Sequence, residues 1–227
     1  MRASSADLIR LTLIAALLLV AGCASQDRSL SLGGGSIPPP PPPPPPPLAG
    51  RVLPDWRSVI RPEDLDKLGR LDFTWRQALQ RIMRSGAPAR LGNLLRPGIE
   101  FGGALPVPGA YGCRTITLRP KGTAAHDLSV GGWSRCAIEP TANGLKFIMG
   151  PRASRLSGLL YPDTDTRMVL LASEGPIVGR TAYVYGHKPE RDLVGVVERL
   201  TGQGWRIVCL WPHSEAVLRI IELRAAS

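Results

Sequence analysis

The densest group of residues able to do chemistry is the segment "YGHKPERD", residues 185–192. This short segment holds a phenol, an imidazole, cations and carboxylates. A second mixed patch, "WPHSE", follows at residues 211–215. The candidate ligand-binding residues are Tyr185, His187, Glu190, Arg191, Asp192 and His213. Glu190 and Asp192 would share one face if they stood two apart on a strand, as an acid/base pair for glycoside cleavage would need.

Two interpretations of this cluster stay open. In one, its charges pair locally at a turn, and any role is in binding. In the other, Glu190 and Asp192, with His187 or His213, form a hydrolase site for envelope glycans or peptides. The sequence lacks G-x-S-x-G, H-E-x-x-H, P-loop and dinucleotide-binding motifs, and its cysteine spacings do not resemble a zinc site. We therefore expect no metal, no cofactor and no catalytic residue, with the hydrolase as the weaker alternative.

The N-terminus carries a different kind of chemistry. Arg2 and Arg10 precede an apolar stretch at residues 11–22, which is shorter than the roughly 20 residues that cross a membrane. This pattern is typical of a secretory signal peptide. The signal ends in "VAGC", which resembles the lipobox of bacterial lipoproteins. The resemblance implies cleavage of residues 1–22 and attachment of fatty acyl chains to Cys23, a stable membrane anchor.

Residues 23–50 are predicted to be a linker between this anchor and the folded part. The linker is rich in glycine and serine and then contains the run Pro38–Pro47. Ten prolines in a polyproline II helix span about 31 Å. Ala24 follows the lipidated cysteine, which by analogy with lipoprotein sorting favours the outer membrane. We expect a domain held on a stalk and facing the periplasm.

The charge of the chain indicates which partners are plausible. The formal net charge is +10. A basic surface in the envelope would face lipopolysaccharide phosphates, acidic glycans or acidic proteins, and nucleic acid is not an expected partner there. The alternative is that the arginines are merely solvated, which the lack of dense runs of like charge favours.

Three cysteines follow the anchor, and an exported compartment is oxidising. Cys113 and Cys136 lie in strand-like segments flanked by polar turns, so we expect them to form a disulfide. Cys209 lies in the apolar run "IVCLW", where a free and buried thiol is expected.

Residues 51–110 are predicted to be helical and then irregular. Pro62 and the acids after it begin a helix over residues 62–84. Its apolar residues recur on one face: Leu65, Leu68, Trp75, Leu79 and Ile82. This face either packs on the core or docks a partner protein, which would make the chain an envelope-assembly lipoprotein. Residues 87–110 show no periodicity and are expected to wrap the fold or close over it.

Residues 111–227 are predicted to form seven to nine short antiparallel strands in the same domain. Segments such as "GLLYPDTDTRMVLL" and "GVVERLTGQGWRIVCLW" are typical of hairpins. Residues 193–200 fit either a strand or a helix, and glycine and valine favour the strand. The expected fold class is α+β, mainly antiparallel β, a small lipocalin-like barrel or sandwich preceded by a helical segment.

The segments "DWRSVIRPEDLDKL", "YGCR", "YGHKPERDLVGVVERL" and "WRIVCLWPHSEAVLRIIEL" together resemble the domain of unknown function 4893 family. The resemblance covers roughly residues 54–224. It implies an exported bacterial protein and carries over no catalytic residue. The most plausible function is therefore a non-enzymatic module that binds an envelope ligand or protein.

Overall fold

The computed structural model describes residues 53–85, 91–119, 128–177, 184–200, 204–211 and 214–226. Three features singled out above lie outside these residues: the signal peptide with Cys23, the proline run and His213.

Helices precede the strands, and short 3-10 turns interrupt both. The helical elements are η1 (Trp56–Ser58), α1 (Pro62–Gly69), α2 (Leu71–Ser85), α3 (Gly92–Leu95), η4 (Arg152–Ser154) and η5 (Pro189–Arg191). The strands are β1 (Gly109–Leu118), β2 (Leu128–Val130), β3 (Ser134–Thr141), β4 (Gly144–Met149), β5 (Arg155–Thr164), β6 (Arg167–Gly175), β7 (Asp192–Arg199), β8 (Gly204–Trp211) and β9 (Ser214–Ala225). Residues 193–200 thus lie largely in a strand, as favoured above.

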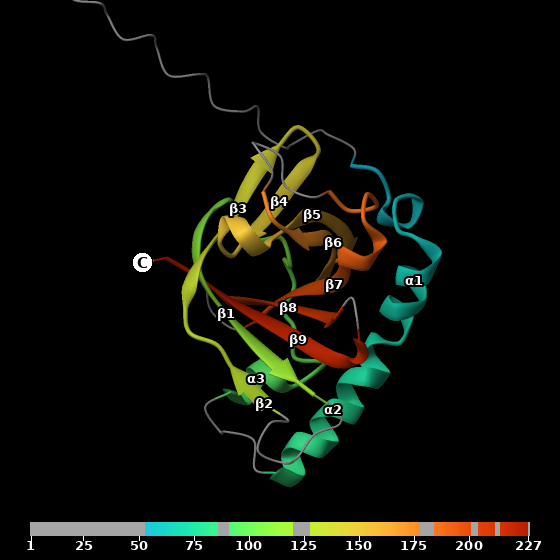
Figure 1. Cartoon of the computed structure of the whole chain (residues 1–227). Coiled ribbons are helices and arrows are strands. Elements are labelled where there is room, and N and C mark those ends of the chain that lie inside the picture. The colour runs from blue at the N-terminus through green and yellow to red at the C-terminus, as the bar shows by residue number, and fades with distance from the viewer. Residues whose placement is uncertain are drawn as a thin grey trace, which may run out of the picture. The chain divides into compact units, whose positions relative to one another are not determined.

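The strands form one closed antiparallel barrel (Figure 1). From β3 to β9 each strand pairs with the next, and β9 returns to pair with β1 from Tyr111↔Ala225 to Leu118↔Leu218. β2 and β3 lie one after the other along the remaining edge of β1. The prediction of a mainly antiparallel β fold is confirmed, and the barrel is the correct form of it.

Side chains fill the interior of this barrel. Inward positions alternate along each strand and carry fully or almost fully buried residues, among them Phe147, Leu170, Ile207 and Ile221. A barrel of about eight strands is just wide enough for its own side chains or one small ligand. Here the side chains take the space, so the interior is a packed core rather than a lipocalin-like ligand cavity.

Two inward-facing glycines allow neighbouring strands to approach closely. A Cβ on Gly158 would overlap the Leu171 carbonyl and Ala172 on β6, and a Cβ on Gly195 would lie 2.8 Å from Cys209 Cβ on β8. Glycine in a strand often marks such a close approach. These positions tighten the barrel wall where β5 meets β6 and β7 meets β8.

The cysteine predictions are confirmed. Cys113 on β1 and Cys136 on β3 form a disulfide inside the barrel, with their Cα atoms 5.8 Å apart. Cys209 is free and wholly buried. Burial raises the pKa of the Cys209 thiol to about 12, so the thiol stays protonated and unreactive.

The long helix predicted over residues 62–84 is instead two helices, because the chain breaks at Arg70 between α1 and α2. Trp75 and Ile82 of α2 pack against the outer wall of the barrel. Figure 1 shows helix α2 at the lower right of the molecule. Leu65, predicted on the buried face, is exposed, and the residue of α1 that is buried is the neighbouring Asp64. None of the helices in the described part of the chain has the length and apolar character needed to cross a membrane.

Arg206, on the outer face of β8, joins the helical layer to the barrel. Its side chain is fully buried, and Nε donates to Glu198 Oε2 at 2.7 Å. Nη1 donates to the carbonyls of Asn93, Leu94 and Arg96 around the end of α3. The guanidinium also lies 4.5 Å from the Trp75 ring centroid. One arginine thus fixes α2, α3 and the barrel together.

Residues 96–108 cross one end of the barrel. Phe101 N donates a hydrogen bond to the Arg199 carbonyl at 3.0 Å, and Gly103 N donates one to the Asp165 carbonyl at 2.9 Å. Both are ordinary hydrogen-bond lengths. Trp205 Nε1 donates to the Ala104 carbonyl at 3.1 Å, with Ala104 buried in the core. These contacts close the end of the barrel that carries Trp205.

Candidate binding surface

The segment singled out in the sequence, residues 185–192, forms a turn leading into β7. His187 and Glu190 are exposed, and Arg191 is half-buried with Nη1 donating to the Glu174 carbonyl at 3.4 Å. Asp192 is buried at the start of β7, and its Oδ2 accepts from Gly186 N at 2.9 Å. Glu190 lies in the 3-10 turn η5 rather than on the strand.

The prediction that Glu190 and Asp192 share a strand face is therefore wrong. Proline at residue 189 favours the turn, and the strand begins only at Asp192. One carboxylate faces solvent and the other is buried, so the two do not flank a common cleft as a glycosidase pair would.

Asp64 of α1, which the sequence showed only as an acid near a helix N-terminus, is the centre of this region. Its side chain is fully buried, and Oδ2 accepts from Arg61 Nη2 at 2.9 Å and from the Tyr185 hydroxyl at 2.7 Å. Oδ1 accepts from Lys67 Nζ at 2.9 Å. Arg61 Nε also lies 3.6 Å from Asp192 Oδ2. Helix α1 is thereby tied to the turn before β7.

The pKa shifts in this network follow from burial and its partners. Burial alone would raise the pKa of Asp64, but hydrogen bonds from Lys67, Tyr185 and Arg61 outweigh it and hold that pKa below its ordinary value. Burial raises the pKa of Asp192 in spite of its contacts with Gly186 and Arg61. Burial likewise raises the pKa of Tyr185. The network keeps Asp64 charged and Tyr185 protonated, which suits a structural connection.

A different surface carries exposed groups that are held in place. The residues between β2 and β3 are Gly131, Gly132 and Trp133. Gly131 N donates to the Thr115 carbonyl of β1 at 2.8 Å, which fixes the connection against the barrel. Trp133 is 47% exposed and lies over Gly112, where an added Cβ would meet its ring at 3.6 Å. An added Cβ at that distance would make an ordinary van der Waals contact, so the indole lies close against β1 at Gly112.

Two arginines on neighbouring strands flank that indole. The guanidinium carbons of Arg114 and Arg224 lie 4.8 and 4.9 Å from the ring centroid of Trp133. Glu222 joins them, since Oε2 accepts from Arg114 Nε at 2.6 Å and Oε1 accepts from Arg224 Nε at 2.8 Å. We call Arg114, Trp133, Arg135, Glu222 and Arg224 the Trp133 surface.

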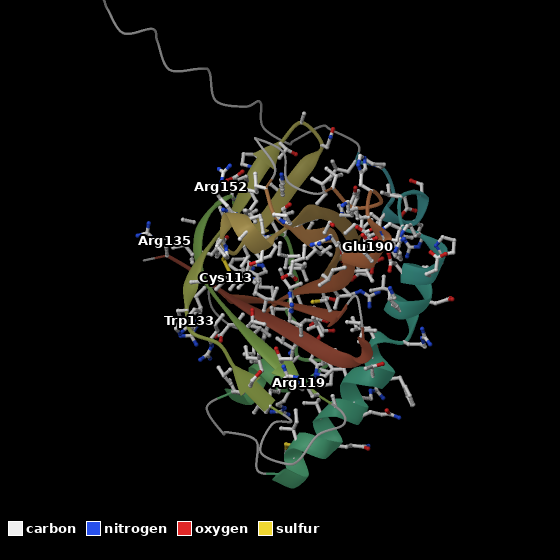
Figure 2. All side chains as sticks on the ribbon, viewed as in Figure 1. Cys113, Arg119, Trp133, Arg135, Arg152 and Glu190 are labelled. Carbon is white, nitrogen blue, oxygen red and sulfur yellow. A yellow bond between two sulfur atoms is a disulfide. The ribbon has the colours of Figure 1, made fainter. Side chains whose placement is uncertain are left out.

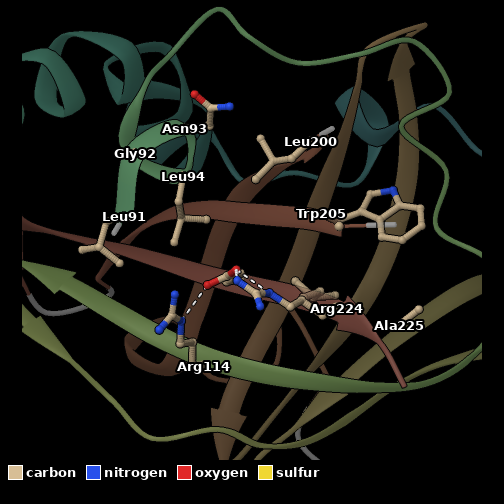
Figure 3. Close-up of a pocket in the computed structure, with 12 residues that line it drawn as sticks. Leu91, Gly92, Asn93, Leu94, Arg114, Leu200, Trp205, Arg224 and Ala225 are labelled. Atoms are coloured by element: carbon tan, nitrogen blue, oxygen red, sulfur yellow. Dashed lines mark hydrogen bonds and ion pairs between the residues drawn. The ribbon is translucent and has the colours of Figure 1, made fainter. Parts of the chain in front are cut away.

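Two hollows adjoin the Trp133 surface. One, of about 630 Å³, lies between the α3 segment and strands β1 and β9; Figure 3 shows Leu91 and Leu94 on one wall, with Arg114 and Arg224 on the other. The second, of about 500 Å³, is lined by Tyr111, Trp133, Arg135 and Arg224. Arg224 and Ala225 line both hollows, so the two hollows are neighbours on this wall. Open pockets with a few fixed polar groups are common ligand sites.

The Trp133 surface and the turn at residues 185–192 are separate. In Figure 2, Trp133 and Arg135 lie on the left of the molecule, and Glu190 lies on the right beside α1. The sequence analysis missed the Trp133 surface because Arg114 and Arg224 become neighbours only when β9 closes on β1. The signal present was the tripeptide "GGW", in which two glycines precede a large aromatic residue between strands.

Within the described part of the chain, no group of three or more His, Cys, Asp and Glu residues has the arrangement to hold a metal ion. The arrangement instead offers cations, an exposed aromatic face and open hollows, which are groups suited to contacting an anionic or ring-shaped ligand.

The fold and surface define a class: a small antiparallel barrel with a packed interior and helices on its outer wall. Residues 56–223 match the family model described as Domain of unknown function (DUF4893). The chain belongs to this family, as the resemblance predicted. A comparison with curated proteins found no significant match.

Proposed function

We propose that this chain is a bacterial envelope lipoprotein whose folded domain is a non-enzymatic binding module facing the periplasm. The anchor rests on the signal peptide with its lipobox at Cys23, and the stalk on Pro38–Pro47. The binding role rests on one observation above all. The barrel interior is packed, while fixed cations and an exposed indole gather on the outer wall beside two hollows.

The hydrolase alternative has less support from the same residues. Glu190 is exposed in a turn, and Asp192 is buried against Gly186 and Arg61. The assembly alternative, docking through residues 62–84, also loses support, because most of the apolar face of α2 packs on the barrel. Binding through the Trp133 surface requires neither a rearranged site nor a displaced helix.

The test uses the full anchored chain in cells. A photoreactive amino acid replaces Gly132, next to Trp133, where an added Cβ meets nothing within 4 Å. Gly69 at the end of α1, also exposed and with open space around it, is the matched control position. We expect light-dependent cross-links to one envelope component from position 132 and none from position 69. Equal cross-linking from both positions, or none from position 132, would contradict the proposed role.

The anchor is tested separately by cell fractionation. Wild-type protein should stay with membranes through a high-salt wash, since burial of acyl chains is not screened by ions. Cys23→Ala should accumulate as uncleaved precursor. Release of the wild type by salt, or normal maturation of the variant, would refute the anchor.

A further inference from the structure

The Trp133 surface combines two kinds of recognition group in a fixed arrangement. One is an indole with nearly half its area exposed, and the other is a set of guanidinium groups around that indole. Backbone and ion-pair contacts hold both before any ligand binds: Gly131 to Thr115, and Glu222 to Arg114 and Arg224. Groups held in advance lose little entropy on binding.

The charge of this surface favours an anion. Its three arginines outnumber its single acid, Glu222, whose carboxylate is already engaged by Arg114 and Arg224. Arg135 is exposed and has no ion-pair partner among the described residues, and the Arg224 side chain is 62% exposed. A guanidinium has five donors in a planar fork, so Arg224 keeps donors free for a carboxylate or phosphate.

The indole and the hollows narrow the class of anion. An aromatic face packs well on the flat C–H face of a sugar ring, and a hollow of about 500 Å³ beside Trp133 has room for such a ring. The neighbouring hollow, of about 630 Å³, also has Arg224 in its lining. A chain of sugars crossing Arg224 would place rings in both hollows and its acid groups near the arginines.

We infer that the Trp133 surface binds an acidic glycan, with Trp133 stacking on a sugar ring and Arg135 and Arg224 binding its anionic groups. This inference names the ligand class for the binding role proposed above and rests on that role. A run of acidic side chains supplies charge but no ring to stack on Trp133, and a single-stranded nucleic acid, which also stacks on aromatic rings, is not expected in the proposed compartment.

The experiment titrates the full-length protein in detergent with oligogalacturonate as the acidic glycan. Neutral malto-oligosaccharide, polyglutamate and oligothymidylate are the comparison ligands. Oligogalacturonate should bind most tightly, and its affinity should fall as salt rises. No binding of oligogalacturonate, or equally tight binding of polyglutamate or oligothymidylate, would overturn the inference.

Matched variants locate the site. Trp133→Ala should weaken oligogalacturonate binding by about tenfold or more, Trp133→Phe should restore part of it, and Phe73→Ala, an exposed aromatic residue on α2, should leave it unchanged. Arg135→Gln should weaken binding by about tenfold, and Arg76→Gln should not. Unchanged affinity in Trp133→Ala, with an unchanged unfolding curve, would overturn the assigned site. Cross-linking from position 132 in cells would still support the broader binding role if oligogalacturonate fails to bind.

Discussion

At the scale of single residues, Gly158 shows how little space the barrel leaves. Any side chain there would overlap the backbone of β6 at Leu171 and Ala172. Gly158→Ala should lower the free energy of unfolding by about 3 kcal/mol or more, or prevent folding, because backbone cannot move aside as a flexible side chain can. Chemical denaturation measures the difference.

Gly69→Ala is the matched control, since nothing lies within 4 Å of the added Cβ at that helical position. It should raise stability by up to about 1 kcal/mol. Equal stability of Gly158→Ala and the wild type would mean that the strands are farther apart than described.

Asp64 gives a prediction about acid stability. Its pKa lies below the ordinary 3.8, so its ionised form stabilises the native state above that value, and the contribution is lost as pH falls through the lowered native pKa. Asp64→Asn should cost about 2–3 kcal/mol near neutral pH, less than a fully buried pair because Arg61 and Lys67 are partly solvated.

The measurement is the free energy of unfolding as a function of pH. The difference between wild type and Asp64→Asn should shrink as the solution becomes more acidic than pH 3.8. Burial raises the pKa of Asp192, so its ionisation lowers the stability of the native state above the unfolded pKa. The pH dependence of the wild type therefore contains both groups, and the comparison between variants isolates Asp64. Asp66→Asn, exposed on the same helix, should change stability by less than about 0.5 kcal/mol. A constant difference at all pH values would contradict the network.

At the scale of elements, Arg206 connects the helical layer to the barrel. Arg206→Met removes donors from three carbonyls around α3 and leaves Glu198 buried without its partner. We expect a loss of about 3–5 kcal/mol, with faster hydrogen exchange over residues 91–100 than elsewhere. Exposed Arg224→Met should not show that pattern.

A second variant separates the ion pair from the carbonyl contacts. Adding Glu198→Leu to Arg206→Met should recover part of the lost stability, because the unpaired carboxylate is then gone. Burial already raises the pKa of Glu198 despite Arg206, which shows how costly its charge is there. No recovery would mean that the carbonyl contacts alone account for the role of Arg206.

Sequence patterns predicted elements better than the contacts between them. Turn residues and short apolar runs predicted the strands because these signals are local. The strand-like segments around Cys113 and Cys136 predicted the disulfide for the same reason. The break at Arg70 follows Gly69, which weakens a helix, but the apolar stripe continues beyond it, so a single helix was predicted. Asp64 and Tyr185 are 121 residues apart, and no local pattern shows that they meet.

At the scale of the whole molecule, the barrel is filled by its own side chains. Its interior is packed from Tyr111 and Trp205 at one end to Cys209 farther along. Residues 96–108 close one end, and the helices cover part of the wall. A molecule with a filled interior would bind ligands on its outer surface. The Trp133 surface could not be predicted from local sequence, because the pairing of β9 with β1 creates it.

The central claim is that binding uses the Trp133 surface and leaves the barrel interior closed. Hydrogen exchange of the full-length protein, alone and with a soluble envelope extract from cells lacking it, tests this claim directly. We predict slower exchange with extract at residues 109–114, 131–135 and 222–226, and no change in β5, β6 and β7. Protection confined to the turn at residues 185–192, or altered exchange throughout the barrel interior, would contradict the account.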